Sequence, residues 1–236
     1  KNFRNEGMDK NHNPEFTMLE FYSAYSDVYD MMDFTENMIR GIANNMTVSH
    51  SIDFSKAFKR FSYFDILHEV TKINFSSIKT ADLLTLLLKE NVSVNKTMGH
   101  GKLLDKAFSY FVETKLLEPT FIIDYPLELS PLAKKKRNSN KNIVERFELF
   151  VSGMEIANSF SELNDPIDQA NRMKEQNILK DLGDEEAQTI DLDFIEAMEC
   201  GMPPCGGVGI GVDRLVMLLT NQISIKDVIL FPAMRK

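Results

Sequence analysis

The sequence predicts an α+β protein built on an antiparallel sheet flanked by helices. Strand-like and helix-like segments follow one another along the 236 residues without the regular strand–helix–strand alternation of a parallel sheet. Residues 144–162 contain two strand-like runs separated by Ser152 and Gly153, which is the spacing of an antiparallel hairpin. Hydrophobic residues make up 43% and charged residues 26% of the chain, so it has the composition of a folded domain.

The first half of the chain is expected to hold a strand, a long helix and an insertion. Residues 14–24 alternate as a strand does, and one face gathers Phe16, Met18, Glu20 and Tyr22. That puts a carboxylate on a largely apolar, aromatic face. Residues 28–46 have the apolar spacing of a helix, carried by Met31, Phe34, Met38, Ile42 and Met46. Residues 55–118 are predicted to be a helical insertion, with helices after Ser62, from Thr80 and from Gly99, and with Ser62 and Thr80 as N-caps.

The second half returns to strands and ends in a glycine-rich segment. The strand-like run TFIIDYPLEL begins at Thr120, and a basic loop over 134–141 leads into the hairpin. A helix is predicted from Asp165 and Pro166 to about Leu182. A shorter helix, capped by Asp191 or Asp193, should end at Gly201. The last segment, GMPPCGGVGIGVDRLVMLLTN, predicts a short strand and then a helix that begins near Asp213.

Composition excludes several classes of function. The net charge of −8 argues against sequence-independent coating of DNA, so no DNA partner is expected. Two cysteines, Cys200 and Cys205, make neither a disulfide framework nor a zinc site. The sequence has no apolar run of the roughly 18 residues that a membrane span needs, and its polar start is unlike a secretory leader. A cytoplasmic protein without a membrane partner is therefore expected. Because the start already has the pattern of a domain interior, the chain is interpreted as a C-terminal fragment.

The hairpin geometry brings two carboxylates together. A two-residue turn at 152–153 would pair Val151 with Met154, Phe150 with Glu155 and Glu148 with Ala157. Glu148 and Glu155 would then be diagonal neighbours about 7 Å apart on one face, where they could hold Mg²⁺. The alternative is that each pairs with a lysine or arginine. Strict alternation would put Asn158, Phe160 and Glu162 on the other face, so uniting them with Glu155 requires a bulge near Ala157.

Two segments carry a family resemblance. FRNEGMDKNHNPEFTMLEFY resembles motif 2 of the class II aminoacyl-tRNA synthetases, and GMPPCGGVGIGVDRLVMLLTN with IKDVILFPAMR resembles their motif 3. The intervening TFIIDYPLELSPLAK and ERFELFVSGMEIANSFSELNDPIDQ are similar to the lysyl-tRNA synthetases of bacterial type. The resemblance implies that residues 1–236 are a partial class II catalytic domain. Motif 1 and the N-terminal OB-fold anticodon-binding domain would lie outside this sequence.

The resemblance also implies a role for each matching residue. Arg4 would contact the α-phosphate of ATP, Glu6 the adenine amino group and His12 the outer phosphates, while Phe16 and Arg214 would sandwich the adenine. Arg4, His12 and Arg214 would be the catalytic residues, and Asn13 and Glu155 would complete the ATP site. Glu148 and Glu155 match the Mg²⁺ ligands. The residues that match the lysine pocket are Glu20, Tyr22, Asn158, Phe160 and Glu162, with Glu162 opposite the ε-ammonium.

The implied function is ATP-dependent activation of L-lysine to lysyl-adenylate, followed by transfer to tRNA(Lys), in a homodimer. Two alternatives remain open at this stage: a related synthetase that adds lysine to a translation elongation factor, and a non-catalytic synthetase-like binding module. The basic run Lys134–Arg137 is either a solvated loop or a contact for tRNA phosphates. Cys205 stands where the resemblance leads us to expect Thr or Ala. Alone, residues 1–236 are expected to expose a sheet edge and to aggregate.

Overall fold

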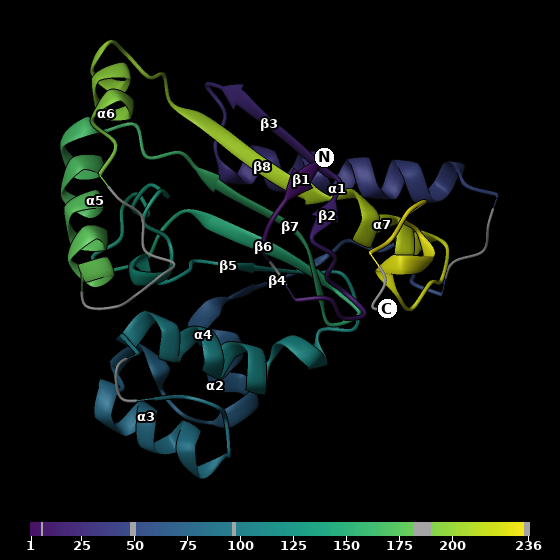
Figure 1. The fold of residues 1–236 in the computed structure, drawn as a ribbon, viewed down its shortest axis with the longest axis horizontal. Coiled ribbons are helices and arrows are strands. Elements are labelled where there is room, and N and C mark those ends of the chain that lie inside the picture. The colour runs from purple at the N-terminus through teal and green to yellow at the C-terminus, as the bar shows by residue number, and fades with distance from the viewer. Residues whose placement is uncertain (6, 48–50, 96–97, 182–189, 234–236) are drawn as a thin grey trace.

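A six-stranded sheet forms the centre of the computed structural model, which describes residues 1–5, 7–47, 51–95, 98–181 and 190–233 (Figure 1). Its strands, in spatial order, are β3 (Met18–Ala24), β8 (Cys205–Gly211), β7 (Met154–Ser161), β6 (Arg146–Val151), β5 (Thr120–Ile123) and β4 (Lys59–Ser62). Neighbouring strands are antiparallel except β4 and β5, which are parallel. The α+β prediction is confirmed. A separate two-stranded hairpin, β1 (Asn2–Phe3) and β2 (Glu15–Phe16), lies beside it.

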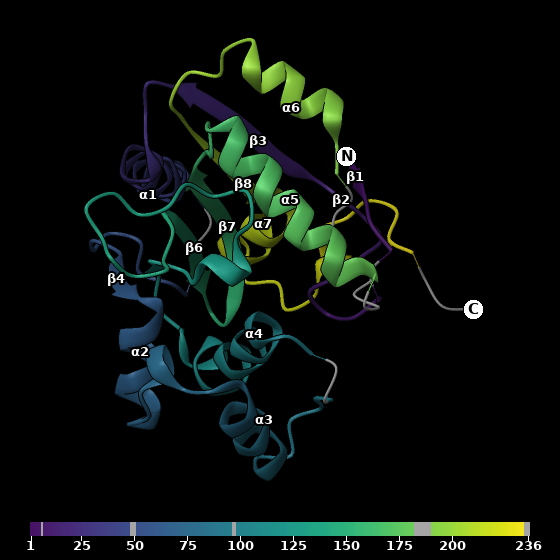
Figure 2. The same ribbon diagram turned by 90° about the vertical axis from the view of Figure 1, so that its left-hand side faces the viewer.

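One face of the sheet is covered by α1 (Val28–Asn45) and α7 (Val212–Leu219), which share a core with β6, β7 and β8. Figure 2 shows α1 on this side and the β1–β2 hairpin on the other. Asp27 caps α1 with a reciprocal capping box to Asp30. The predicted apolar stripe of this helix is partly wrong, because Phe34 and Ile42 are exposed. The buried face instead includes Thr35 and Glu36.

The insertion forms a small helical module with its own core. Its helices are α2 (Tyr63–Thr71), α3 (Thr80–Lys89) and α4 (His100–Phe111). The Ser62 side chain caps α2 as predicted, but α3 has Lys79 as its N-cap residue, without a side-chain hydrogen bond. The predicted boundary at 55 is too early, because Lys59–Ser62 is strand β4 of the main sheet. A four-residue strand with Lys and Arg at an edge carries a weak signal in the sequence.

Two further helices, α5 (Pro166–Asp181) and α6 (Leu192–Glu199), stand together at the end of the sheet where β7 finishes and β8 begins (Figures 1 and 2). Asp191, one of the two predicted caps, accepts the backbone N–H of Phe194 at 2.9 Å. Within the part of the chain that the structure describes, no helix has both the length and the apolar character needed to cross a bilayer.

The β6–β7 hairpin has the predicted turn and an irregular register beyond it. Ser152 and Gly153 both have positive φ, at 53° and 70°, as a tight hairpin turn requires. Val151 pairs with Met154 and Phe150 with Glu155, as predicted. Glu148, however, pairs with Asn158 rather than Ala157, because the register shifts by one residue between Leu149 and Phe150. The predicted bulge is therefore present, and it puts Glu155 on the same face as Asn158.

Candidate active site

Three adjacent strands build a flat surface on the face of the sheet away from α1. Tyr22 of β3 and Phe160 of β7 flank Gly207 of β8, and in the next row Glu20 and Asn158 flank Gly209. We call this surface, with Glu162 at the end of β7, the glycine floor. The five predicted lysine-pocket residues, which come from two distant parts of the chain, are thus brought together on it: Glu20, Tyr22, Asn158, Phe160 and Glu162.

The glycines of the floor are sterically required. A Cβ atom on Gly207 would lie 2.2 Å from Oε1 of Glu162 and 2.6 Å from Cε1 of Tyr22. Both side chains therefore lie directly over Gly207, and only glycine fits at this position. Burial raises the pKa of Glu162 to about 7 because a charged carboxylate is poorly solvated there. Tyr22 has its pKa raised by burial and by the nearby charges of Glu162 and Glu20. The end of the floor therefore favours a positively charged ligand.

Glu20 lies on the predicted face of its strand, which it shares with Tyr22. Its side chain is exposed, and its cross-strand neighbour Gly209 contributes no side chain to cover it.

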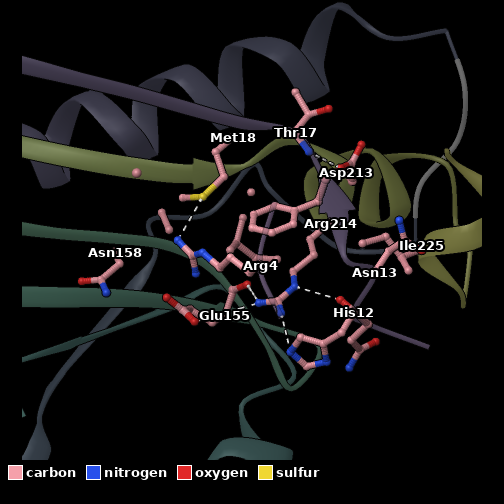
Figure 3. A pocket seen from close by; sticks show the side chains of 16 residues that line it. Arg4, His12, Asn13, Thr17, Met18, Glu155, Asn158, Asp213, Arg214 and Ile225 are labelled. Atoms are coloured by element: carbon pink, nitrogen blue, oxygen red, sulfur yellow. Dashed lines mark hydrogen bonds and ion pairs between the residues drawn. The ribbon is translucent and has the colours of Figure 1, made fainter. Parts of the chain in front are cut away.

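A cavity of about 230 Å³ opens next to the floor, and Arg214 of α7 is one of the side chains that line it (Figure 3). Arg214 donates to the backbone oxygens of Glu155 at 2.8 Å and Asn11 at 3.3 Å, and its Nη2 lies 3.0 Å from Nε2 of His12. The guanidinium of Arg4 lies 5.2 Å from the ring centre of Phe16. The predicted residues that line this Arg214 cavity are Arg4, His12, Asn13, Phe16, Glu155, Asn158 and Arg214.

The two motif regions are joined at Thr17, where the predicted strand 14–24 is interrupted between β2 and β3. Thr17 donates its backbone N–H to Oδ2 of Asp213 at 2.6 Å and accepts from the N–H of Val212 at 3.0 Å. Both hydrogen bonds are made by the backbone of Thr17, which follows Phe16 directly. They therefore fix the position of Phe16 relative to the start of α7. Asp213 is 9% exposed, and the sequence analysis did not single it out.

The paired carboxylates lie in unequal environments. The Glu148 carboxylate accepts a hydrogen bond from Arg146 and one from the Tyr125 hydroxyl, the latter at 2.7 Å. Burial, followed by the charge of Glu148, raises the pKa of Glu155. A bound cation would offset this effect of Glu148 on Glu155, so the donor set fits a hard metal ion such as Mg²⁺. The alternative of arginine partners is also met, because Arg146 is bound to Glu148 and Nη1 of Arg214 lies 3.9 Å from Oε2 of Glu155. Within the described ranges, no cluster of three or more His, Cys, Asp or Glu side chains is arranged for a metal.

Arg146 is the main residue that sequence reasoning missed. It is bound to Glu148, donates to Oδ1 of Asn158 at 3.2 Å, and its guanidinium lies 4.6 Å from the ring centre of Tyr125. An arginine two residues before Glu148 on a strand was the available signal, since i and i+2 share a face. Asn13 is 2% exposed and lies at the cavity wall, and its Oδ1 atom has no hydrogen-bond partner among the described residues. Glu6 lies outside the described residues.

Basic side chains of the loop make hydrogen bonds and ion pairs with neighbouring parts of the chain. Lys134 donates to Asn164 at 2.8 Å, Lys136 to Asp124 at 2.6 Å, and Arg137 to Glu145 at 2.7 Å and Asp27 at 2.6 Å. Of the four basic side chains in 134–137, three are therefore used within the chain. This pairing weakens the expectation that the loop contacts tRNA phosphates.

Comparison with known proteins identifies the family. Residues 1–235 match the family of class II tRNA synthetases for Asp, Lys and Asn. The chain belongs to this family. Among its relatives, the lysine–tRNA ligases of Porphyromonas gingivalis W83 and Prochlorococcus marinus MIT 9301 are each 51% identical to it, over 100% and 99% of the chain. That of Staphylococcus epidermidis RP62A is 48% identical over 99%. The chain spans 42%, 47% and 49% of these three synthetases, which is about half of each.

Proposed function

We propose that this chain is the catalytic part of a lysine–tRNA ligase, which activates L-lysine with ATP and transfers it to tRNA(Lys). The observation that carries the proposal is Glu162. Its carboxylate lies at one end of the glycine floor with a pKa raised to about 7 by burial, and the other end of the floor opens into the Arg214 cavity through Asn158 and Gly209. A single ligand that lies along the floor could therefore place its cationic end at Glu162 and its reacting group beside Arg214.

Lysine would lie along the floor with its ε-ammonium at Glu162. Tyr22 and Phe160 would line its aliphatic chain, since both flank Gly207. Glu20 and Asn158, in the next row, would hold the α-amino and carboxylate groups. Asn158 is oriented by Arg146, whose Nε donates to Asn158 Oδ1, so its amide N–H groups remain directed to a ligand. The names of the relatives, lysine–tRNA ligases, support this choice of amino acid.

ATP would occupy the Arg214 cavity. The adenine would stack on Phe16, with Arg214 on its other face and Glu6 at its amino group, and Arg4 would leave the Phe16 ring to bind the α-phosphate. His12 and Asn13 would contact the phosphates and ribose from the cavity wall. The lysine carboxylate then attacks the α-phosphorus, and pyrophosphate leaves. No protein nucleophile is required, because the work of the site is orientation and neutralisation of charge by Arg4, His12 and Arg214.

Mg²⁺ would be held by Glu148 and Glu155, because a cation there would offset the charge of Glu148 that helps to raise the pKa of Glu155. When bound, the ion would neutralise charge on the phosphate oxygens during transfer. The protein's own contribution is to keep Glu148 in place through Arg146 and Tyr125. The full-length protein is proposed to act in the cytoplasm as a homodimer.

Lysine-dependent pyrophosphate exchange in the full-length protein tests the proposal. We expect exchange with lysine, ATP and Mg²⁺, followed by transfer of lysine to tRNA(Lys). Intact ATP binding without exchange would leave only a binding module. Exchange with transfer to a protein acceptor rather than to tRNA would identify the paralogous modifying enzyme.

A further inference from the structure

The side of β8 that faces the floor has Gly209, Gly207 and Cys205 at alternate positions, in order from the Arg214 cavity outward. Residues 205, 207 and 209 share one face by alternation, and a Cβ on the intervening Gly206 would meet Met31 and Asp27 of the α1 side instead. The Cys205 side chain therefore lies on the floor side, immediately beyond Gly207. It is 9% exposed, so the thiol is enclosed rather than open to solvent.

Cys205 is the cross-strand neighbour of Glu162. The N–H of Glu162 donates to the carbonyl oxygen of Cys205 at 2.9 Å, which continues the β7–β8 register that pairs Ser161 with Gly206. Directly opposed side chains in such a pair have Cβ atoms about 5 Å apart. Burial, and then the charge of Glu162, raise the pKa of the Cys205 thiol, and the contribution of Glu162 agrees with this closeness. The thiol is thus a small, neutral group beside the proposed ammonium partner.

We infer that Cys205 is the end wall of the amino-acid pocket and limits the length of the substrate side chain. Gly207 and Gly209 contribute no side chains along about 7 Å of β8, which is of the order of the extended aliphatic chain of an amine such as lysine. The Glu162 carboxylate and the Tyr22 ring reach over this span at its Gly207 end. Cys205 is the first side chain of β8 beyond this gap. An amino acid one methylene longer would push its ammonium past Glu162 and into the sulfur. The inference rests on the proposed function and adds a specificity-determining residue to it.

The test compares amino acids in the full-length enzyme and in its Cys205→Ala variant. Pyrophosphate exchange is measured with lysine, with homolysine, which is one methylene longer, and with ornithine, which is one methylene shorter. We expect the lysine-to-homolysine ratio of kcat/KM to fall by about 10-fold in Cys205→Ala, the usual value of one methylene in a pocket. The lysine-to-ornithine ratio should stay unchanged, since ornithine does not reach the wall. An unchanged lysine-to-homolysine ratio would overturn the inference.

A larger residue gives the opposite test. Cys205→Leu should raise the KM for lysine at least 10-fold and leave the KM for ATP unaltered, with the exposed Cys200 changed to Leu as the matched control. Equal increases for lysine and ATP would overturn the assignment of the wall. Absence of lysine-dependent exchange in the unmodified enzyme is a different result, which would count against the proposed function itself.

Discussion

Nη2 of Arg214 lies 3.0 Å from Nε2 of His12 at the wall of the cavity. A guanidinium can only donate, so Nε2 of His12 is the acceptor and the imidazole proton is on Nδ1. Nδ1 lies 2.9 Å from Oδ2 of Asp9, which accepts its hydrogen bond. The backbone N–H of Asn11 and then His12 lower the pKa of Asp9 against the opposing effect of burial. Asp9 therefore sets the tautomer of His12, and His12 in turn orients Arg214.

Asp9→Ala should weaken ATP and leave lysine binding unchanged. Without Asp9 the imidazole loses its orienting hydrogen bond, and the backbone N–H groups of Asn11 and His12 lose their acceptor. At about 1 kcal/mol for each net hydrogen bond, the KM for ATP should rise by roughly 5-fold or more. Nitrogen-15 NMR of His12 should show the Nδ1–H tautomer in the unmodified protein and a mixture in the variant. A single Nε2–H tautomer in the unmodified protein would contradict the arrangement.

Glu162→Gln should weaken lysine far more than ATP. A desolvated ammonium would lose its charge partner, which costs about 2 to 5 kcal/mol, and calorimetric titration of both ligands measures the difference. Glu199→Gln, on the exposed surface of α6, is the control for loss of one negative charge. If the two affinities fell together, the amino-acid pocket would have to lie elsewhere.

The pH dependence follows from the raised pKa of Glu162. Its pKa of about 7 exceeds the ordinary 4.5, so near pH 6 the ligand-free folded protein holds a proton that the unfolded chain has lost. Glu162 thus adds stability that is complete below about pH 4.5 and is lost as the pH rises through 7. A bound ammonium favours the carboxylate, so lysine binding should release a proton at pH 6.5. Calorimetry in phosphate and in Tris should give different binding enthalpies, and equal enthalpies would refute the linkage.

Gly207→Ala should strongly weaken lysine binding while the protein remains folded. The added Cβ would lie 2.2 Å from Glu162 Oε1 and 2.6 Å from Tyr22 Cε1, so both pocket side chains must move. Because overpacking costs up to about 3 kcal/mol, the KM for lysine should rise by about 100-fold with little change for ATP. Gly41→Ala is the control, because nothing lies within 4 Å of its added Cβ and alanine favours a helix by roughly 0.5–1 kcal/mol. Normal lysine kinetics in Gly207→Ala would show that the floor is not the pocket.

Local signals were enough for some elements and insufficient for others. The turn at Ser152 and Gly153 and the cap at Ser62 depend on neighbouring residues, so the sequence predicted both correctly. Strand β4 and the partner of Glu148 depend on pairing with distant strands and on a one-residue bulge, which alternation alone does not locate. The glycine floor needed the resemblance to be recognised, because β3, β7 and β8 meet only in the folded sheet.

Arg137→Met should destabilise the fold because it leaves the buried Glu145 carboxylate without its charged partner. Glu145 is 3% exposed, and its Oε1 accepts from both Nε and the backbone N–H of Arg137. Loss of the guanidinium would leave a buried carboxylate with the Ser161 hydroxyl and one N–H as donors. Because Arg137 is itself 53% exposed, we expect about 2 kcal/mol, below the usual cost of breaking a fully buried pair. Lys135→Met removes the same charge from an exposed position in the loop, and urea unfolding of the two variants should separate them. Equal stabilities would show that the loop is held by its backbone bonds alone.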